Sequence, residues 1–461
     1  MIRGEARLAR QQRGFLIGRP HPPEPPPPGM IARVAAARAV MEAVTQARPL
    51  EERLAADLSL RDARLDPRDP ALARSIATVA LRRLGTIRKA LAQKLDKGMP
   101  KRSGILEWTL ITGAAQILFL DAPDHAAVDL AVRAARADAA SAPFAGLVNA
   151  VLRGVARDRE AILAASDPFD DDTPPWLAAR WRETYGEETA RAIAAAHRSE
   201  PTLDISVKSD PAAWAEKLGG IVLPTGSVRL DTHKAVAELQ GYAEGEWWVQ
   251  DAAAALPARL LDVRPGSRVV DLCAAPGGKS AELAAAGAAV TTVDRSAERL
   301  KVLAQNFERL RLHSDVVVAD ALVLEAPPFD AALIDAPCLA TGTIRRHPDV
   351  AWTKRPSDLA QVVKLQAQLL DKAIALTRPG GAIVYCTCSL EPEEGEAQIA
   401  AVLRRNPDVR RSAIGSHEIG GLAECLTPSG ELRTLPCHLW GDDPRRAGLD
   451  GFFAARLVKA G

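Results

Sequence analysis

The stretch RVVDLCAAPGGKSAELAAA, residues 268–286, joins an apolar run, a glycine-rich turn and a helix-forming segment without interruption. The run RVVDLC has the short length and the β-branched valines of a buried strand. Gly277 and Gly278 allow the backbone to approach a ligand closely, and Pro276 stiffens the turn before them. The segment SAELAAA has the composition of a helix. The stretch therefore predicts a strand, a ligand-binding turn and a helix, which is the repeating unit of an α/β sheet.

The same alternation of short β-rich runs and helices continues toward the C-terminus. Further strands are predicted at AVTTVD (289–294), SDVVVAD (314–320), AALIDAP (331–337) and GAIVYCTCS (381–389), and a long helix is predicted over residues 357–377. Alternation of this kind indicates a parallel sheet that helices cover on both faces. Ligands of such sheets bind at the carboxyl ends of the strands. We therefore expect an α/β domain over residues 241–461, with its functional residues along that edge.

The chain before this domain has a helical pattern. In IARVAAARAVMEAV, residues 31–44, apolar side chains recur at spacings of three and four, which is the period of an amphipathic helix. Four later segments repeat the pattern, at residues 72–84, 106–120, 124–137 and 144–158. We therefore predict an all-α bundle over residues 30–166. Residues 1–29, which contain HPPEPPPPG, are expected to be a disordered proline-rich leader, and residues 170–240 a mixed middle segment.

The composition excludes several classes of protein. The 461 residues include 59 basic and 58 acidic side chains, so the total charge does not indicate a polyanion partner, although residues 31–160 hold 21 basic and 15 acidic ones. There is no run of about 18 apolar residues and no apolar signal core, so neither a membrane span nor secretion is expected. Six cysteines without zinc-type spacing indicate neither a metal site nor a disulfide scaffold, and a cytoplasmic protein is expected.

Acidic residues stand at the ends of three successive predicted strands, at Asp271, Asp294 and Asp320. An acidic residue in the position of Asp294 commonly accepts hydrogen bonds from ribose hydroxyls, and Asp320 could accept one from an adenine amino group. The alternative is that these residues only begin turns or cap helices. A P-loop is excluded, because Cys273 stands where the pattern GxxxxGK[ST] requires its first glycine.

Six short motifs carry a resemblance to a known family: QDAA (250–253), CAAPGGK (273–279), DAPC (335–338), RRHPD (345–349), TCS (387–389) and DGFF (450–453). With them, residues 241–461 resemble the RNA 5-methylcytosine methyltransferases, which use S-adenosylmethionine. The helical segments 72–87, 113–121 and 149–160 resemble the NusB-like RNA-binding domain of the RsmB (Sun/Fmu) family. The resemblance implies a multidomain protein in which an all-α NusB-like bundle precedes a class I, Rossmann-like methyltransferase domain. It also implies 16S rRNA, or a small-subunit precursor, as the partner.

The resemblance further implies roles for individual residues. The cofactor S-adenosylmethionine is expected against the glycine-rich turn and three acidic residues: Cys273, Ala274, Ala275, Pro276, Gly277, Gly278, Lys279, Asp294, Asp320 and Asp335. Cys388 is implied as the nucleophile that adds to C6 of cytosine, because C5 is a poor nucleophile until a thiolate makes the ring enamine-like. Cys338 is implied to assist product release, and Asp335 to bind the N3/N4 edge of the base. The alternative for a free cysteine is a small buried hydrophobe, which is the role expected for Cys386.

Basic side chains are the candidates for RNA contacts, because they bind phosphate. They are Arg345, Arg346 and His347 after DAPC, and Arg82, Arg83, Arg88 and Lys89 in the bundle. The alternatives are an ordinary surface loop and a solvated helix face. Two other functions stay open: the same chemistry on tRNA or another RNA, and a non-catalytic RNA-binding or antitermination-type protein with a relic domain. The presence of Cys388, Cys338 and Asp335 together counts against a relic.

Overall fold

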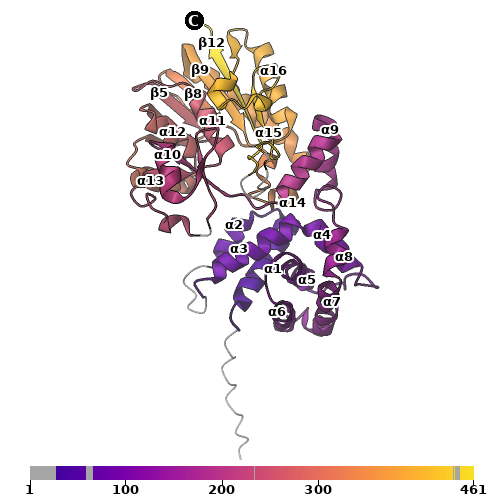
Figure 1. Cartoon of the computed structure of the whole chain (residues 1–461). Helices are drawn as coiled ribbons and strands as arrows, with labels where there is room; N and C mark the ends of the chain where they lie inside the picture. Colours follow the sequence, from indigo (N-terminus) through magenta and orange to yellow (C-terminus); the bar gives the residue numbers. More distant parts are fainter. Residues whose placement is uncertain (1–26, 59–65, 233, 440, 442–446) are drawn as a thin grey trace, which may run out of the picture.

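The computed structural model describes residues 27–58, 66–232, 234–439, 441 and 447–461, so the predicted leader lies outside the described residues up to position 26. A helical bundle and an α/β domain form two bodies, and α9 (Pro175–His197) and a small sheet connect them along the chain (Figure 1). This arrangement confirms the predicted fold class. In the described ranges, no helix is long and apolar enough to cross a membrane.

Eight helices of the described chain form the bundle, and α5 is the most deeply buried of the long ones. They are α1 (Met30–Gln46), α2 (Leu50–Asp57), α3 (Asp69–Arg82), α4 (Leu84–Ala92), α5 (Leu106–Phe119), α6 (Asp124–Ala137), α7 (Ala145–Arg157) and α8 (Arg159–Ala164). Leu110 and Ile111 of α5 are fully buried in the core that these helices share. The helix predicted over residues 72–84 is two helices, because Arg83 leaves the helical backbone conformation (φ −120°, ψ 21°).

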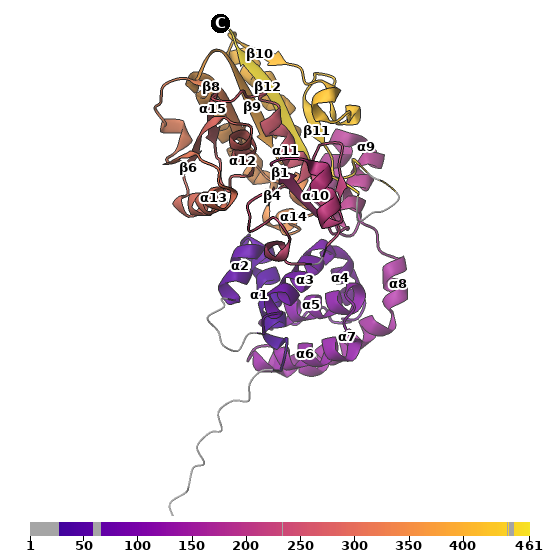
Figure 2. The same cartoon turned by 60° about the vertical axis from the view of Figure 1, so that its left-hand side comes forward.

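A small antiparallel sheet follows α9. Its strands lie in the order β2 (Ile221–Val222), β3 (Val228–Leu230), β1 (Leu203–Val207) and β4 (Trp247–Val249), and α10 (Pro211–Leu218) joins β1 to β2. Figure 2 shows β1, β4 and α10 beside the larger sheet. β4 belongs to this sheet because it pairs with β1, and Trp247 packs in the core of the sheet while Trp248 packs against α12 (Gly278–Ala285) and α13 (Ala297–Leu310). The middle unit therefore continues beyond the predicted boundary at residue 240.

The α/β domain is built on an eight-stranded sheet in the described residues. Its strands lie in the order β10 (Val409–Ser412), β12 (Phe452–Lys459), β9 (Thr377–Thr387), β8 (Phe329–Asp335), β5 (Arg268–Leu272), β6 (Ala289–Asp294) and β7 (Asp315–Val318), with β11 (Leu432–Thr434) paired to β12. The five strands from β9 to β7 are parallel, and β12 pairs antiparallel with its neighbours. The carboxyl ends of the parallel strands therefore share one edge.

Apolar side chains of the strands alternate between the two faces of this sheet. On β8, Leu333 packs with α11 (Ala252–Arg259) and α12 (Gly278–Ala285). The next residue, Ile334, packs on the other face with α15 (Pro356–Leu376) and α16 (Glu396–Arg405). α13 (Ala297–Leu310) packs beside α12. Both faces are thus covered, as expected for a parallel sheet with nearly continuous apolar strands.

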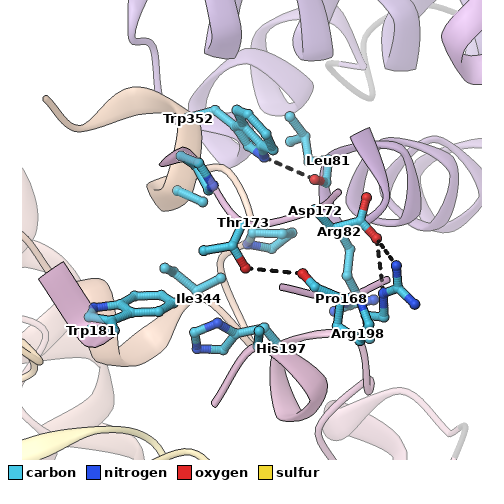
Figure 3. Close-up of a pocket in the computed structure, with 14 residues that line it drawn as sticks. Leu81, Arg82, Pro168, Asp172, Thr173, Trp181, His197, Arg198, Ile344 and Trp352 are labelled. Carbon is cyan, nitrogen blue, oxygen red and sulfur yellow. Dashed lines mark hydrogen bonds and ion pairs between the residues drawn. The ribbon is translucent and has the colours of Figure 1, made fainter. Parts of the chain in front are cut away.

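Residues 345–352 hold the bundle against the α/β domain. α14 (Val350–Thr353) lies near the end of α3 (Figure 3). Three hydrogen bonds cross this junction: the Trp352 indole N–H donates to the Leu81 carbonyl (2.9 Å), Arg82 Nη2 to the Arg345 carbonyl (2.9 Å) and the Leu50 amide to Asp349 Oδ2 (3.2 Å). The cavity between these elements has a volume of about 20 Å³, which is room for roughly one water molecule. The junction is therefore tightly packed.

Candidate active site

The turns after β8 and β9 bring two cysteines together. The two strands are parallel neighbours, and Asp335 lies opposite Cys386 in their register. Cys338 follows the first strand and Cys388 the second, and their sulfur atoms are 3.5 Å apart. Both side chains are partly exposed. The motifs DAPC and TCS therefore form a single site at the carboxyl edge of the sheet.

A pair of glycines supports the turn that carries Cys388. The Gly342 amide donates to the Cys388 carbonyl (3.0 Å), and the Gly451 amide donates to the Gly342 carbonyl (2.8 Å). A Cβ atom on Gly342 would lie 1.9 Å from the Gly451 carbonyl oxygen. The two backbones can approach this closely only because position 342 has no side chain. The DGFF motif thus reaches the active site through backbone contacts.

The two thiols differ in their surroundings. The hydrogen bond with Cys388 and burial both raise the pKa of Cys338 well above its usual value. A thiol with a raised pKa keeps its proton at neutral pH. Cys338 can therefore donate its proton to the contact with the Cys388 sulfur. Cys338 is therefore the weaker candidate for a thiolate.

Lys279 holds Asp335 in place beside the cysteines. Its Nζ lies 2.7 Å from Asp335 Oδ2 and 4.8 Å from the centre of the Phe452 ring. Burial alone would lower the pKa of Lys279, but the adjacent Asp335 carboxylate outweighs it and the net shift is upward. Lys279 is therefore charged. Asp335 keeps 35% of its side-chain surface exposed, so it can reach a ligand while paired with Lys279.

The glycine-rich turn connects the end of β5 to the first turn of α12. Gly277 has a φ of 104°, a conformation that favours glycine, and Gly278 begins the helix. Cys273 also has a positive φ, of 69°. Burial raises the pKa of Cys273 to about 12, so this thiol stays protonated, and it packs against the apolar core of the sheet.

A buried carboxylate lies directly beneath the turn. Asp271, at the end of β5, is 1% exposed, and burial raises its pKa to about 7. The Ser280 hydroxyl donates to Asp271 Oδ2 (2.5 Å). Asp271 Oδ1 has no hydrogen-bond partner among the described residues. The edge of the sheet therefore holds an acceptor that the protein leaves unused.

The two other acidic residues predicted at strand ends differ in exposure. Asp294 is buried at the end of β6 and accepts hydrogen bonds from the amides of Ser296 (2.9 Å) and Ala275 (3.4 Å), the second of which belongs to the glycine-rich turn. Asp320 is exposed just beyond β7 and accepts one from the Leu322 amide (2.9 Å). Asp320 therefore caps the short 3-10 turn that follows it, which is the alternative role considered for these acidic residues. Because it is exposed, it is also accessible to a ligand.

Of the two predicted RNA-binding arginines after DAPC, one is buried and the other is partly buried. Arg345 is 1% exposed and donates to a backbone carbonyl. Arg346 pairs with Asp251 (2.5 Å) and Asp450 (3.2 Å). Arg345 has almost no surface for RNA phosphate, whereas Arg346 keeps 21% of its side-chain surface exposed but already pairs with carboxylates. The next residue, His347, is exposed and stays a candidate.

The predicted RNA-binding residues of the bundle fall into two pairs. Arg82 and Arg83 are partly buried, and Arg82 takes part in the junction with the α/β domain. Arg88 and Lys89 are exposed on α4, where they lie 3.3 and 2.9 Å from carboxylate oxygens. Exposed ion pairs of this kind contribute little free energy, so both side chains can exchange a carboxylate for a phosphate. Arg88 and Lys89 are therefore the accessible members of the set.

Arg346 is the centre of a buried ionic cluster that the sequence analysis did not predict. Its guanidinium lies 2.5 Å from Asp251, 3.2 Å from Asp450 and 3.7 Å from Asp204, and Asp204 also forms two bonds of 2.7 Å with Arg229. Motifs RRHPD, QDAA and DGFF each contribute one member, and β1 contributes Asp204. The sequence did contain a signal for this cluster, because one motif carries a cation (RRHPD) and two others each carry a carboxylate (QDAA and DGFF). The cluster ties the middle sheet to the turn after β8.

The remaining cysteines have structural surroundings. Cys386 is fully buried, and its thiol lies 3.6 Å from Asp335 Oδ1. Cys425 Sγ lies 3.2 Å from His438 Nδ1, and Cys437 is partly buried nearby in the chain. The described part of the chain contains no group of three His, Cys, Asp or Glu side chains that could hold a metal ion.

Models of two protein families match this chain. The model described as 16S rRNA methyltransferase RsmB/F matches residues 258–458, and the model of the NusB family matches residues 30–157. The first range contains the two cysteines, Asp335 and the glycine-rich turn. The second covers the helical bundle.

Similar proteins extend over nearly the whole chain. The ribosomal RNA small subunit methyltransferase B of Xanthomonas campestris pv. campestris is 36% identical and covers 94% of this chain and 98% of its own length. The protein with the same description in Vibrio cholerae is 34% identical and covers 93% and 98%.

Solved structures share the fold. The crystal structure of PH0851 superimposes with a TM-score of 0.72 at 22% identity, covering 94% of this chain and 99% of that one. A methyltransferase homologue from Pyrococcus horikoshii has a TM-score of 0.51 at 25% identity, covering 62% and 94%. With both domains matched and relatives above 30% identity along almost its full length, the chain belongs to the RsmB/F family of 16S rRNA methyltransferases.

Proposed function

We propose that this protein transfers a methyl group from S-adenosylmethionine to C5 of one cytosine in 16S rRNA, by way of a covalent bond between Cys388 and C6 of the base. The observation that carries the proposal is the 3.5 Å contact between the sulfurs of Cys338 and Cys388, with Asp335 at the adjacent strand end. The relatives described as rRNA small subunit methyltransferases support the class of RNA.

The residues of the site account for each bond that must change. The Cys388 thiolate adds to C6, which makes C5 nucleophilic toward the methyl group that bound S-adenosylmethionine supplies. Asp335, held by Lys279, accepts a hydrogen bond from the N4 amino group at the N3/N4 edge, and N3 takes up a proton from solvent as negative charge builds there during the addition and returns it on elimination. A base then removes the C5 proton, its electron pair restores the C5–C6 double bond, and the bond to the Cys388 sulfur breaks. Cys338 is close enough to assist this last step.

The carboxyl edge of the sheet fits S-adenosylmethionine chemically. The sulfonium of this cofactor is a cation and its ribose carries hydroxyl donors, both of which suit carboxylate partners. Asp271, Asp294 and Asp320 supply carboxylates at three successive strand ends, and Asp271 Oδ1 lacks a partner among the described residues. The cofactor would therefore lie against residues 273–279, with Asp294 and Asp320 as acceptors.

Asp294→Asn is expected to weaken S-adenosylmethionine binding by about tenfold or more, because a neutral amide accepts hydrogen bonds less strongly than a carboxylate. Calorimetric titration measures the dissociation constant. The matched control is Asp315→Asn, which alters an exposed residue at the start of β7 and should leave the affinity unchanged. Equal affinities of the two variants would place the cofactor elsewhere.

Cys338→Ala is expected to form the covalent bond to RNA and to release the product roughly 100-fold more slowly, because assistance to the elimination step is lost. A covalent RNA–protein adduct should then accumulate and migrate as a slower band on a denaturing gel. Cys437→Ala, at a partly exposed cysteine outside the site, is the control and should give no such band. Normal turnover of Cys338→Ala without an adduct would remove the release role.

The class of RNA is tested by bisulfite sequencing of ribosomal and transfer RNA from cells with and without the protein. The proposal predicts that one cytosine of 16S rRNA loses its protection from conversion when the protein is absent. Of the bundle residues predicted to bind RNA, Arg88 and Lys89 are the exposed ones. A change in tRNA alone would correct the substrate, whereas no change in any RNA would overturn the reaction.

A further inference from the structure

Glu394 is a fully buried carboxylate below the two cysteines. It ends a short 3-10 turn (Pro392–Glu394) between β9 and α16. Its carboxylate accepts hydrogen bonds from the Ser389 hydroxyl (2.6 Å), the Gln366 side-chain amide (2.8 Å) and the Leu339 amide (3.1 Å). Burying a carboxylate is costly unless such bonds replace those of water. All three donors are uncharged, so the carboxylate is held by geometry and not by a counter-ion.

The donors to Glu394 flank both reactive positions. Leu339 directly follows Cys338, and Ser389 directly follows Cys388. One carboxylate group therefore ties together the two turns whose cysteines meet at 3.5 Å. Because these bonds go to neighbours of the cysteines, they fix the backbones and leave the thiols available for chemistry.

Gln366 of α15 completes the hold on the first turn. The same amide group that donates to Glu394 also donates to the Pro337 carbonyl (2.9 Å), on the other side of Cys338. The Gln398 amide in turn donates to the Gln366 side-chain oxygen (3.4 Å), which orients the Gln366 amide. The backbone on both sides of Cys338 is thus fixed by one buried carboxylate–amide pair.

The backbone of Glu394 fixes the second turn. Its carbonyl accepts hydrogen bonds from the Tyr385 hydroxyl (2.8 Å) and the Thr387 hydroxyl (3.3 Å), both on the final part of β9. The residue therefore contacts β9 before Cys388 through its backbone and the turn after Cys388 through its side chain.

We propose that Glu394 is a positioning residue that sets the separation of the Cys338 and Cys388 sulfurs. The importance of Glu394 for turnover rests on the proposed function, in which both cysteines take part. Its effect on the distance between the two sulfurs does not depend on that reaction. Displacement of reacting groups by about 1 Å can reduce a rate by roughly 100-fold, so a residue that holds both turns matters to the reaction without touching the base. The sequence EPEEGE offers a neighbour for comparison, because Glu393 is 43% exposed and pairs with Arg180 (2.6 Å) on the surface.

The test measures how fast diamide oxidises Cys338 and Cys388 to a disulfide in the full chain without RNA or cofactor. The two thiols lose their hydrogens to diamide as the S–S bond forms, and peptide mapping identifies the linked pair. The unmodified protein and Glu393→Gln are expected to form the 338–388 link at the same rate. Glu394→Gln should form it about tenfold more slowly, and Ser389→Ala, which removes only one of the bonds, should fall in between. Thermal unfolding shows that each variant is folded at the temperature used.

Equal rates of disulfide formation in Glu394→Gln, Ser389→Ala and the unmodified protein would overturn the positioning role. So would an unmodified protein in which the 338–388 link does not form.

Steady-state kinetics of methyl transfer give a second, independent test. Glu394→Gln should lower kcat with an unchanged KM for S-adenosylmethionine, whereas a role in cofactor binding would raise that KM. The two proposals can fail separately. If disulfide formation is slower in Glu394→Gln, but the unmodified protein does not become linked through Cys388 to RNA containing 5-fluorocytosine, then the proposed reaction is wrong and the positioning role of Glu394 stands.

Discussion

Cys388→Ala is expected to lower the rate of methyl transfer by roughly 10⁴-fold or more, because the variant cannot form the bond to C6 that activates C5. The cysteine lies in the turn after β9, outside the glycine-rich turn of residues 273–279, so binding of S-adenosylmethionine should stay within about twofold of the unmodified protein. Radiolabelled methyl incorporation into RNA measures the first quantity and calorimetric titration the second.

Two comparisons make the result of Cys388→Ala specific. Cys437→Ala should retain activity, because that cysteine lies outside the site. Cys388→Ser should be nearly as inactive as Cys388→Ala, because a hydroxyl of similar size is a far weaker nucleophile toward C6. Substantial turnover in either Cys388 variant would show that the nucleophile is another group.

Arg346→Met is expected to destabilise the catalytic domain by about 3–5 kcal/mol, because it leaves Asp251, Asp450 and Asp204 buried without the cation between them. For a domain of this size such a loss lowers the thermal unfolding midpoint by roughly 6–20 °C. Differential scanning calorimetry separates the transition of this domain from that of the bundle.

The control for this change is an exposed ion pair of the same type. Arg378 lies 2.7 Å from Asp330 on the surface, and its side chain is 52% exposed. Arg378→Met should therefore cost about 1 kcal/mol or less. Adding Asp450→Asn to Arg346→Met should restore part of the lost stability, since it removes one uncompensated charge. Similar midpoints for Arg346→Met and Arg378→Met would show that the cluster does not stabilise the domain.

The sequence predicts the strands of the catalytic domain closely where apolar runs are bounded by clear breaks. The strand predicted at residues 289–294 is β6, and the helix predicted over 357–377 is α15 (Pro356–Leu376). These segments have the composition and period of one element type, and Gly287 and Pro356 mark where they begin, so local information decides them. The helix predicted over 72–84 is the exception, because its local pattern is continuous but the backbone at Arg83 leaves the helical conformation.

The sequence predicts that each active-site motif follows the end of a strand, but it does not predict which strands are neighbours. The neighbouring positions of β8 and β9, which bring Cys338 and Cys388 within 3.5 Å, depend on the order of strands in the sheet. The ion pairs of Arg346 could not be predicted from the local sequence, because RRHPD has the composition of a basic surface loop. Its partners Asp251 and Asp450 are distant in the chain, and only the folded sheet brings them together.

The central claim is that the Cys388 sulfur bonds transiently to C6 of a cytosine. RNA in which fluorine replaces the hydrogen at C5 tests it directly, because the fluorine cannot leave as a proton does and the adduct persists. The measurement is mass spectrometry of the crosslinked peptide after incubation of active protein with 5-fluorocytosine-containing 16S rRNA and S-adenosylmethionine. The account predicts attachment at Cys388 and no attachment in Cys388→Ala. Attachment at another residue, or no adduct from a preparation that methylates ordinary RNA, would contradict it.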